Sequence, residues 1–141
     1  MKSHGFEVLD HTADIGIRVR GSSIVNLFEN AALGMLSLWF GELPNAPAED
    51  ETSLEVSAMD HEQLLVRFLN ELVYLVDSKK NLPLQFAIRI ENGISLLASV
   101  RGVDLRKLEL VPLTYVKAAT YHQLKIKEES DGFTAEIYFD V

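Results

Sequence analysis

Apolar and polar residues alternate in several stretches of the chain, a pattern typical of strands with one buried face. The predicted strands cover residues 6–10, 14–20, 84–91, 94–103 and 133–141, with a shorter one at 54–56. Asn92-Gly93 joins two of these stretches and predicts a hairpin turn, because both residues tolerate a positive φ. Residues 117–127 are predicted to form one long strand. This strand should pair antiparallel with residues 133–141 across a turn at residues 128–132.

Two other stretches show the apolar spacing of helices. The first follows Ser22 and Ser23, either of which can cap a helix, and it ends at Gly41, a typical left-handed terminator. Its apolar stripe consists of Ile24, Leu27, Phe28, Ala31 and Met35. Gly34 lies inside this helix, where glycine costs about 1 kcal/mol relative to alanine. We therefore expect a neighbouring strand to approach the helix closely at Gly34.

The second helix should begin at Asp60, which together with Gln63 gives the pattern of a capping box. Its buried stripe is predicted to contain Leu65, Phe68, Leu69, Leu72, Leu75 and Val76. Two helices and six or seven strands indicate the α+β class. We expect a single two-layer domain over residues 1–141, with a largely antiparallel or mixed sheet and both helices packed on one face.

The amino-acid composition excludes several classes of function for this chain. The chain of 141 residues is 48% hydrophobic, contains no cysteine and has a formal net charge of -8. Thiolate metal sites and disulfides are therefore excluded, and the sequence has no apolar run that could span a membrane and no signal-peptide pattern. We expect a cytoplasmic protein. Its net charge should repel free nucleic acid, although a local basic patch can still exist. Acidic proteins more naturally dock on basic protein surfaces or bind divalent cations.

Several carboxylates are predicted to meet near one strand end. Asp10 and Asp14 flank the turn before the second strand, and Asp140 precedes the terminal carboxylate of Val141. If the last strand lies beside the strand that Asp14 opens, these hard oxygen donors suit Ca²⁺ or Mg²⁺. The alternative is that they cap backbone amides or are merely solvated. Spacing alone favours this alternative, because no known metal loop is matched.

Two further residues are candidates for chemistry. Lys117 begins the stretch Lys-Ala-Ala-Thr-Tyr-His and could contact an anion or a partner carboxylate, or it could be an ordinary exposed lysine. His11 could be an acid–base group or a ligand, although a structural role bonding a loop carbonyl is the more usual one. The sequence contains no nucleophile elbow, P-loop, dinucleotide-binding glycine pattern or zinc motif. Residue chemistry alone thus indicates an acidic α/β domain with a candidate cation site.

The chain resembles the archease family, and four stretches carry this resemblance. They are residues 10–17 (Asp-His-Thr-Ala-Asp-Ile-Gly-Ile), 27–32 (Leu-Phe-Glu-Asn-Ala-Ala), 117–122 (Lys-Ala-Ala-Thr-Tyr-His) and the ending 139–141 (Phe-Asp-Val). Each motif alone is weak, but their combination, order and separation are specific and extend over essentially the whole chain.

The resemblance implies a protein cofactor of the GTP-dependent RNA-splicing ligase, which acts in tRNA splicing and RNA repair. Such a cofactor would promote guanylylation of the ligase and multiple turnover without being an enzyme itself. The resemblance implies that the family's metal site carries over to Asp14, Asp140 and Val141, with a divalent cation that we expect to be Ca²⁺; Mg²⁺ and Mn²⁺ are the alternatives. The lysine important for ligase activation carries over to Lys117. No direct nucleic-acid contact and no membrane association are expected.

Two other functions compete with this interpretation. A small metal-dependent enzyme, for example a phosphohydrolase, could use the same carboxylates to activate water. A chaperone-like module for RNA processing could bind several partners. The enzyme would turn over a phosphate substrate alone with Mg²⁺ or Mn²⁺, whereas an activator would do nothing without its ligase, and a chaperone-like module would bind unrelated RNA enzymes in a pull-down.

Overall fold

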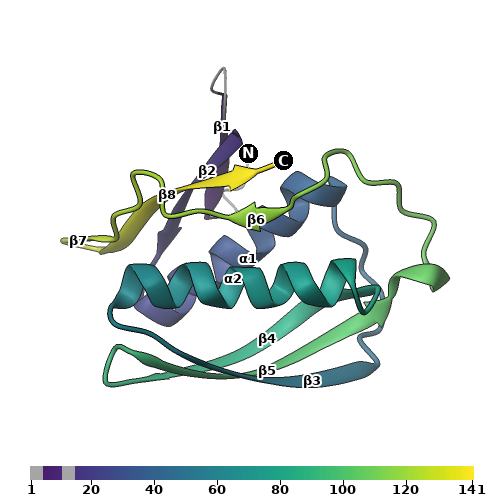
Figure 1. Ribbon diagram of the computed structural model, residues 1–141, viewed down its shortest axis with the longest axis horizontal. Helices are drawn as coiled ribbons and strands as arrows, with labels where there is room; N and C mark the ends of the chain where they lie inside the picture. Colours follow the sequence, from purple (N-terminus) through teal and green to yellow (C-terminus); the bar gives the residue numbers. More distant parts are fainter. Residues whose placement is uncertain (1–4, 11–14) are drawn as a thin grey trace.

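The computed structural model describes residues 5–10 and 15–141, without the side chain of Asp10. In this part of the chain two antiparallel sheets enclose two helices (Figure 1). The helices are α1 (Ile24–Phe40) and α2 (His61–Asp77), and a single 3-10 turn, η1, covers Leu105–Lys107. The strands are β1 (Phe6–Asp10), β2 (Ile15–Gly21), β3 (Asp50–Ser57), β4 (Asn81–Glu91), β5 (Ser95–Asp104), β6 (Ala118–Ala119), β7 (Lys127–Glu129) and β8 (Gly132–Asp140).

The two sheets differ in composition. The five-stranded sheet has the order β1-β2-β8-β6, and β7 also pairs with β8. It therefore joins the two ends of the described chain, because β2 lies between β1 and the last strand. The three-stranded sheet has the order β3-β5-β4 and is built entirely from the middle of the chain. Figure 1 shows the five-stranded sheet above the helices and the three-stranded sheet below them.

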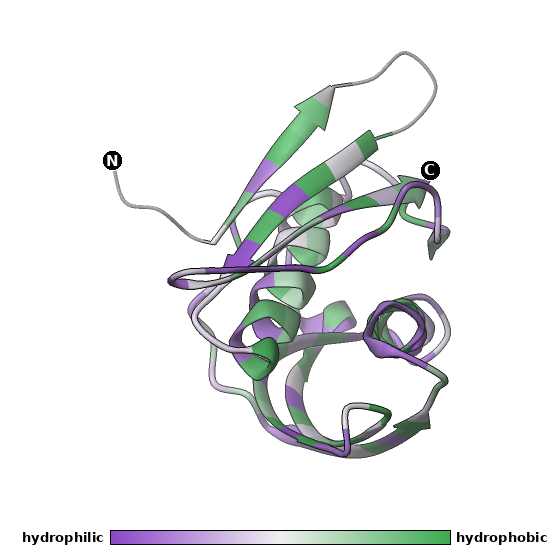
Figure 2. Cartoon of the chain, turned by 90° about the vertical axis from the view of Figure 1, so that its left-hand side faces the viewer, coloured by the Kyte–Doolittle hydropathy of each residue, from purple (hydrophilic) through white to green (hydrophobic). Residues whose placement is uncertain are grey.

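The helix α1 is the centre of the fold. Ser23 caps it by accepting a hydrogen bond from the Asn26 N–H, and Gly41 ends it with a φ of 79°. None of its 17 residues is exposed, and Figure 2 shows hydrophobic residues along its length. At Gly34 an added Cβ would lie 2.8 Å from the Ile17 side chain. The predicted close approach of a strand to this glycine is thus confirmed.

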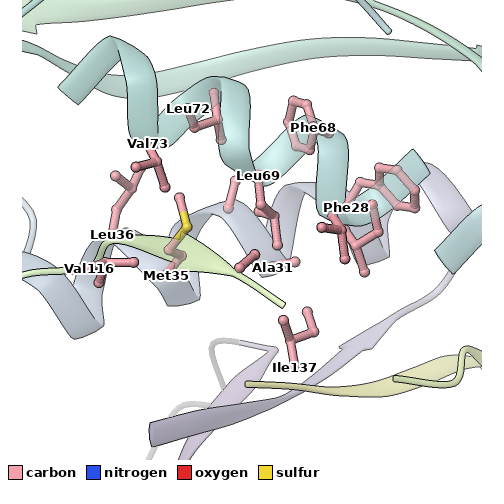
Figure 3. Close-up of a cluster of buried hydrophobic side chains, with 14 of the residues drawn as sticks. Phe28, Ala31, Met35, Leu36, Phe68, Leu69, Leu72, Val73, Val116 and Ile137 are labelled. Atoms are coloured by element: carbon pink, nitrogen blue, oxygen red, sulfur yellow. The ribbon is translucent and has the colours of Figure 1, made fainter. Parts of the chain in front are cut away.

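The helix α2 is amphipathic, with exposed residues at Arg67, Glu71 and Tyr74. Its cap is the predicted one, since Asp60 accepts a hydrogen bond from the Gln63 N–H at 2.8 Å. The six residues predicted to form its buried stripe are all buried. Figure 3 shows residues of α2 facing α1, with Val116 and Ile137 of the five-stranded region close by. The hydrophobic core therefore lies between the sheets and around both helices.

The α+β class and the antiparallel pairing are confirmed. The layering differs from the expected single sheet with both helices on one face, because the strands divide into two sheets and the helices pack against both. The physical reason lies in α1, since none of its residues is exposed and its apolar side chains must therefore be covered on opposite sides. No helix among residues 5–10 and 15–141 combines the length and apolarity needed to cross a membrane.

The prediction of one long strand at residues 117–127 is wrong. Only β6 and β7 form there, and residues 120–126 between them belong to no strand. A turn interrupts the strand, because the Leu124 N–H donates to the Tyr121 carbonyl at 3.0 Å and Gln123 has a φ of 53°. The alternation that suggested a strand arises because Leu124 and Ile126 pack on the core without ladder bonds. The predicted hairpin survives as the short β7–β8 pair.

Candidate functional site

The end of β8 and the short strand β6 bring Lys117 and Asp140 together. Ala118 pairs with Asp140 in the ladder, and the Lys117 N–H donates to the Asp140 carbonyl at 2.8 Å. Alternation along β8 turns Phe139 inward, so the Asp140 side chain is exposed, as is that of Lys117. The predicted acid and the predicted lysine are therefore backbone neighbours at one sheet edge.

The beginning of β2 lies beside this edge. Ile15 pairs with Phe139, and Asp10 of β1 pairs with Ile15 on the other side. Asp14, His11 and the side chain of Asp10 lie outside the described residues, so the predictions made for them are not tested. In the described residues the start of β2 does lie beside the end of β8, and the predicted cation site requires this pairing.

The described donors for a cation are of the hard oxygen type. Asp140 is exposed, and Val141 beside it is 43% exposed. Ca²⁺ usually takes six to eight oxygen ligands. Within residues 5–10 and 15–141 no group of three or more acidic or histidine side chains is close enough to bind a metal. The described residues therefore fit part of a cation site and do not complete one.

Tyr138 contacts residues of two of the motif stretches, 10–17 and 117–122. An alanine Cβ at Gly16 would lie 2.7 Å from the Tyr138 ring, so the ring occupies the space that a side chain would need. The Thr120 hydroxyl donates to the Tyr138 carbonyl at 3.0 Å, and the His122 ring meets the Tyr138 ring edge-on at 5.8 Å. Gly16, Thr120 and His122 thus have packing roles next to the candidate site.

Two contacts that the sequence did not reveal fix the segment before and within β6. The Asn70 side chain of α2 accepts from the Ala119 N–H at 2.8 Å and donates to the Ala119 carbonyl at 3.3 Å. The Tyr115 hydroxyl donates to Asp77 at the end of α2, and this hydrogen bond is the main reason why the pKa of Tyr115 is raised. A polar Asn70 among the apolar residues of α2 was the one available signal for the first contact.

Charged residues continue along the outer face of the same sheet. The Arg18 guanidinium donates to Glu136 from Nε at 3.2 Å and from Nη2 at 2.9 Å, and to Glu7 from Nη1 at 2.5 Å. Hydrogen bonds to Glu136, and then to Glu7, raise the pKa of Arg18 above its ordinary value. Three adjacent strands, β1, β2 and β8, are cross-linked in this way.

Taken together, the fold and the sheet edge define a small α+β protein whose exposed lysine and aspartate are joined through a strand ladder. A model of the Archease protein family matches residues 6–141. A protein archease of Methanosarcina barkeri is 36% identical over 149 residues, covering 100% of each chain. A protein archease of Thermococcus kodakarensis is 38% identical over 130 residues, covering 90% of this chain and 91% of its own.

Solved structures have the same fold. The solution structure of Methanobacterium thermoautotrophicum protein 1598 superimposes with a TM-score of 0.79 at 26% identity and covers 99% of this chain and 100% of its own. The crystal structure of a Thermotoga maritima archease, described as a possible chaperone, has a TM-score of 0.67 at 24% identity, with 96% of each chain covered. The chain belongs to the archease family, and the resemblance of its motifs is thereby confirmed.

Proposed function

We propose that this protein is an accessory activator of the GTP-dependent RNA-splicing ligase, promoting ligase guanylylation and multiple turnover in tRNA splicing and RNA repair. Membership of the archease family supports an archease role in general. The single observation that carries the finer proposal is the backbone bond between Lys117 and Asp140, because it places a cationic and an anionic group at one exposed sheet edge.

The cation in this proposal is held by Asp14, Asp140 and the terminal carboxylate of Val141. Ile15 lies opposite Phe139, so the strand that follows Asp14 runs beside the strand that ends in Asp140. Carboxylate oxygens are the ligands that Ca²⁺ and Mg²⁺ prefer. A bound divalent ion would neutralise the acids at this edge and supply a positive centre for phosphate or ligase groups. Lys117 would add a second positive charge next to it.

Exposed side chains around this edge suit contact with another protein. Tyr115 and Tyr121 on either side of Lys117 are 48% and 52% exposed, and Val141 is 43% exposed. Tyrosine is enriched in protein interfaces, where its ring packs and its hydroxyl can bond. The description of the Thermotoga maritima relative as a possible chaperone is consistent with action through a protein partner. We infer that the ligase docks on this edge.

The proposed role is that of an activator and involves no catalysis by the chain itself. The relatives are named protein archease, a name that states no reaction. In the proposal Lys117 and Asp140 act only when the ligase is bound. This separates it from the phosphohydrolase alternative, in which the same carboxylates would activate water without a partner.

A guanylylation assay tests the proposal. Ligase, GTP and Mn²⁺ are mixed with the wild-type protein, Lys117→Ala or Asp140→Ala, and covalent ligase–GMP and joined RNA are measured over time. We expect wild type to accelerate both and each variant to lose most of the stimulation. Removing a charge-assisted contact of this kind costs about 1.5–3 kcal/mol, or roughly tenfold to a hundredfold.

Matched controls change equivalent charges elsewhere. Lys79→Ala, in the turn after α2, and Glu55→Ala, on the exposed face of the three-stranded sheet, should stimulate as wild type does. Full stimulation by Asp140→Ala would exclude a role for the predicted cation site. Hydrolysis of a generic phosphate ester by the protein alone, lost in Asp140→Ala, would instead support the enzymatic alternative.

A further inference from the structure

A basic pocket lies on the outer face of the five-stranded sheet, beside the first half of β8 and away from the Asp140 end that lies next to Lys117. Its volume is about 330 Å³, in the range of small-molecule sites. Arg18 and Arg20 of β2 form one side, Lys125 and Lys127 form the other, and Glu129 and Glu136 also line it. Four of the thirteen lysines and arginines of an acidic chain thus surround one hollow.

The four cations are not equivalent. Arg18 is neutralised by Glu136 and Glu7, which fix its guanidinium against the sheet. Within the described part of the chain, Arg20, Lys125 and Lys127 form no ion pair, and all three are exposed. Four cations and the two carboxylates of Glu129 and Glu136 line the pocket, which therefore keeps a local positive excess in a chain whose overall charge is -8. A local excess of this kind attracts anions at short range, whereas the net charge acts at longer range.

The irregular segment 120–126 holds the lysines in place. Leu124 and Ile126 pack on the core, so that alternation leaves Lys125 and Lys127 exposed. The Ile126 N–H donates to the Glu62 carboxylate of α2 at 2.9 Å, which ties the segment to the helix. The segment thereby presents Lys125 across the hollow from β2, and Lys127 follows it as the first residue of β7.

The other lining groups indicate which anion fits. Thr134 and Gln123 contribute a hydroxyl and an amide, which can hydrogen-bond to anionic oxygens. Among the described residues that line the pocket, none is aromatic. A site that reads bases usually stacks them on aromatic rings, so this pocket is suited to the backbone or terminal phosphates of a ligand. A second hollow of about 290 Å³ shares Arg20, Glu129 and Thr134 and extends the surface toward Gly21.

We propose that this pocket binds phosphate groups, either those of a nucleoside triphosphate or those of a short single-stranded RNA. The proposal does not depend on the proposed ligase activation. It departs from the expectation that an acidic chain makes no contact with nucleic acid, because three unpaired cations act locally. Long duplexes should still be repelled by the remaining surface.

The test uses the full chain, isotopically labelled, and follows its backbone amides by NMR at low salt without any ligase. The ligands are inorganic pyrophosphate, GTP, a short single-stranded RNA and an acidic peptide of equal charge. We expect the phosphate ligands to shift the amides of Lys125, Lys127 and Thr134. Lys125→Gln combined with Lys127→Gln should weaken binding by about tenfold, which corresponds to losing two exposed charge contacts.

A matched variant distinguishes binding at this pocket from a general effect of the net charge on anion binding. Lys79→Gln combined with Arg89→Gln removes the same charge from the turn after α2 and from the three-stranded sheet, and should weaken binding by less than about twofold. For RNA, the slope of log affinity against log salt should fall by about 0.7 for each lost phosphate contact in the pocket variant only.

The ligand series identifies the source of the phosphate. GTP or pyrophosphate binding as tightly as RNA supports a nucleotide site, and tighter binding of RNA supports a strand. The proposal is overturned if no ligand shifts the pocket amides, if both double variants weaken binding equally, or if the acidic peptide binds as tightly as RNA. All the changed residues are exposed, so a thermal melt should show unchanged folding. Because no ligase is present, failure here leaves the proposed function standing, and the reverse also holds.

Discussion

The two sheets that enclose the helices differ in regularity. In the three-stranded sheet, residues 50–57 pair with residues 95–102 without interruption, and β4 pairs with β5 with a single irregularity between Pro83 and Gln85. In the five-stranded sheet, β6 has two residues and β7 has three, and residues 120–126 leave the ladder between them. The candidate functional residues that the structure describes, Lys117, Asp140 and Val141, lie at the irregular sheet.

This difference in regularity indicates that the two sheets have different roles in the fold. An uninterrupted ladder satisfies its backbone groups internally and leaves its outer side chains evenly spaced along the strands. Where the ladder breaks, side chains such as Asn70 and Glu62 hold the chain, and the irregular segment leaves Lys125 exposed between its two packed neighbours, Leu124 and Ile126. The regular sheet thus has the form of a scaffold, and the irregular sheet carries the groups to which we assign the proposed binding functions.

The largest effect should come from the core that serves both sheets. Phe68 is fully buried and its ring stacks on Phe28 at 6.0 Å and meets Phe86 edge-on at 6.3 Å. Phe68→Ala should lower the free energy of unfolding by about 3–5 kcal/mol. Urea unfolding measures this, with Tyr74→Ala, an exposed residue of the same helix, changing it by at most about 0.5 kcal/mol. If Phe68→Ala melts only one sheet, as judged by hydrogen exchange, the common core is not shared as described.

A smaller and more local effect is expected from Asn70→Ala. The buried Ala119 backbone would lose both partners, which costs about 1–3 kcal/mol. Native-state hydrogen exchange should show faster exchange of the Ala119 amide, while amides of β5, for example that of Val100, change only by the global loss of stability. Equal acceleration in both sheets would mean that the irregular sheet does not open separately.

The smallest expected effect is on the pH dependence of the free energy of unfolding. The bond from Tyr115 to Asp77 requires the phenol proton and raises the pKa of Tyr115 in the folded state. The stability that it contributes is therefore complete below the ordinary tyrosine pKa of about 10 and is lost as pH rises through the higher folded value. The difference in unfolding free energy between wild type and Tyr115→Phe should shrink in that window. A difference that stays constant across it would contradict the assignment.

The regular parts of the fold could be predicted from sequence because local signals decide them. Asn92 and Gly93 both have a positive φ, as the hairpin turn requires, and Asp60 caps α2. Residues 120–126 were mispredicted since Leu124 and Ile126 alternate for packing, and periodicity does not distinguish packing from ladder bonding. The division into two sheets depends on α1 being covered so far that none of its residues is exposed, which a one-sided stripe did not reveal.

The candidate site was harder to predict from residues alone. Lys117 and Asp140 become neighbours only through the pairing of β6 with β8, which is a long-range register and has no local signal. Resemblance to the family suggested a functional role for them, which stays a prediction. The basic pocket was visible only in three dimensions, because Arg18 and Arg20 lie more than a hundred positions before Lys125. The role of Tyr138 likewise required the structure, since its ring covers Gly16 from a neighbouring strand.

The packing of Tyr138 over Gly16 has an evolutionary consequence. A side chain larger than glycine at position 16 collides with the ring, and a smaller residue at position 138 removes the surface on which His122 rests. Positions 16, 122 and 138 should therefore change in concert across descendants of one ancestor, although they are far apart along the gene. A collection of related genes in which they drift independently would show that this stack is dispensable.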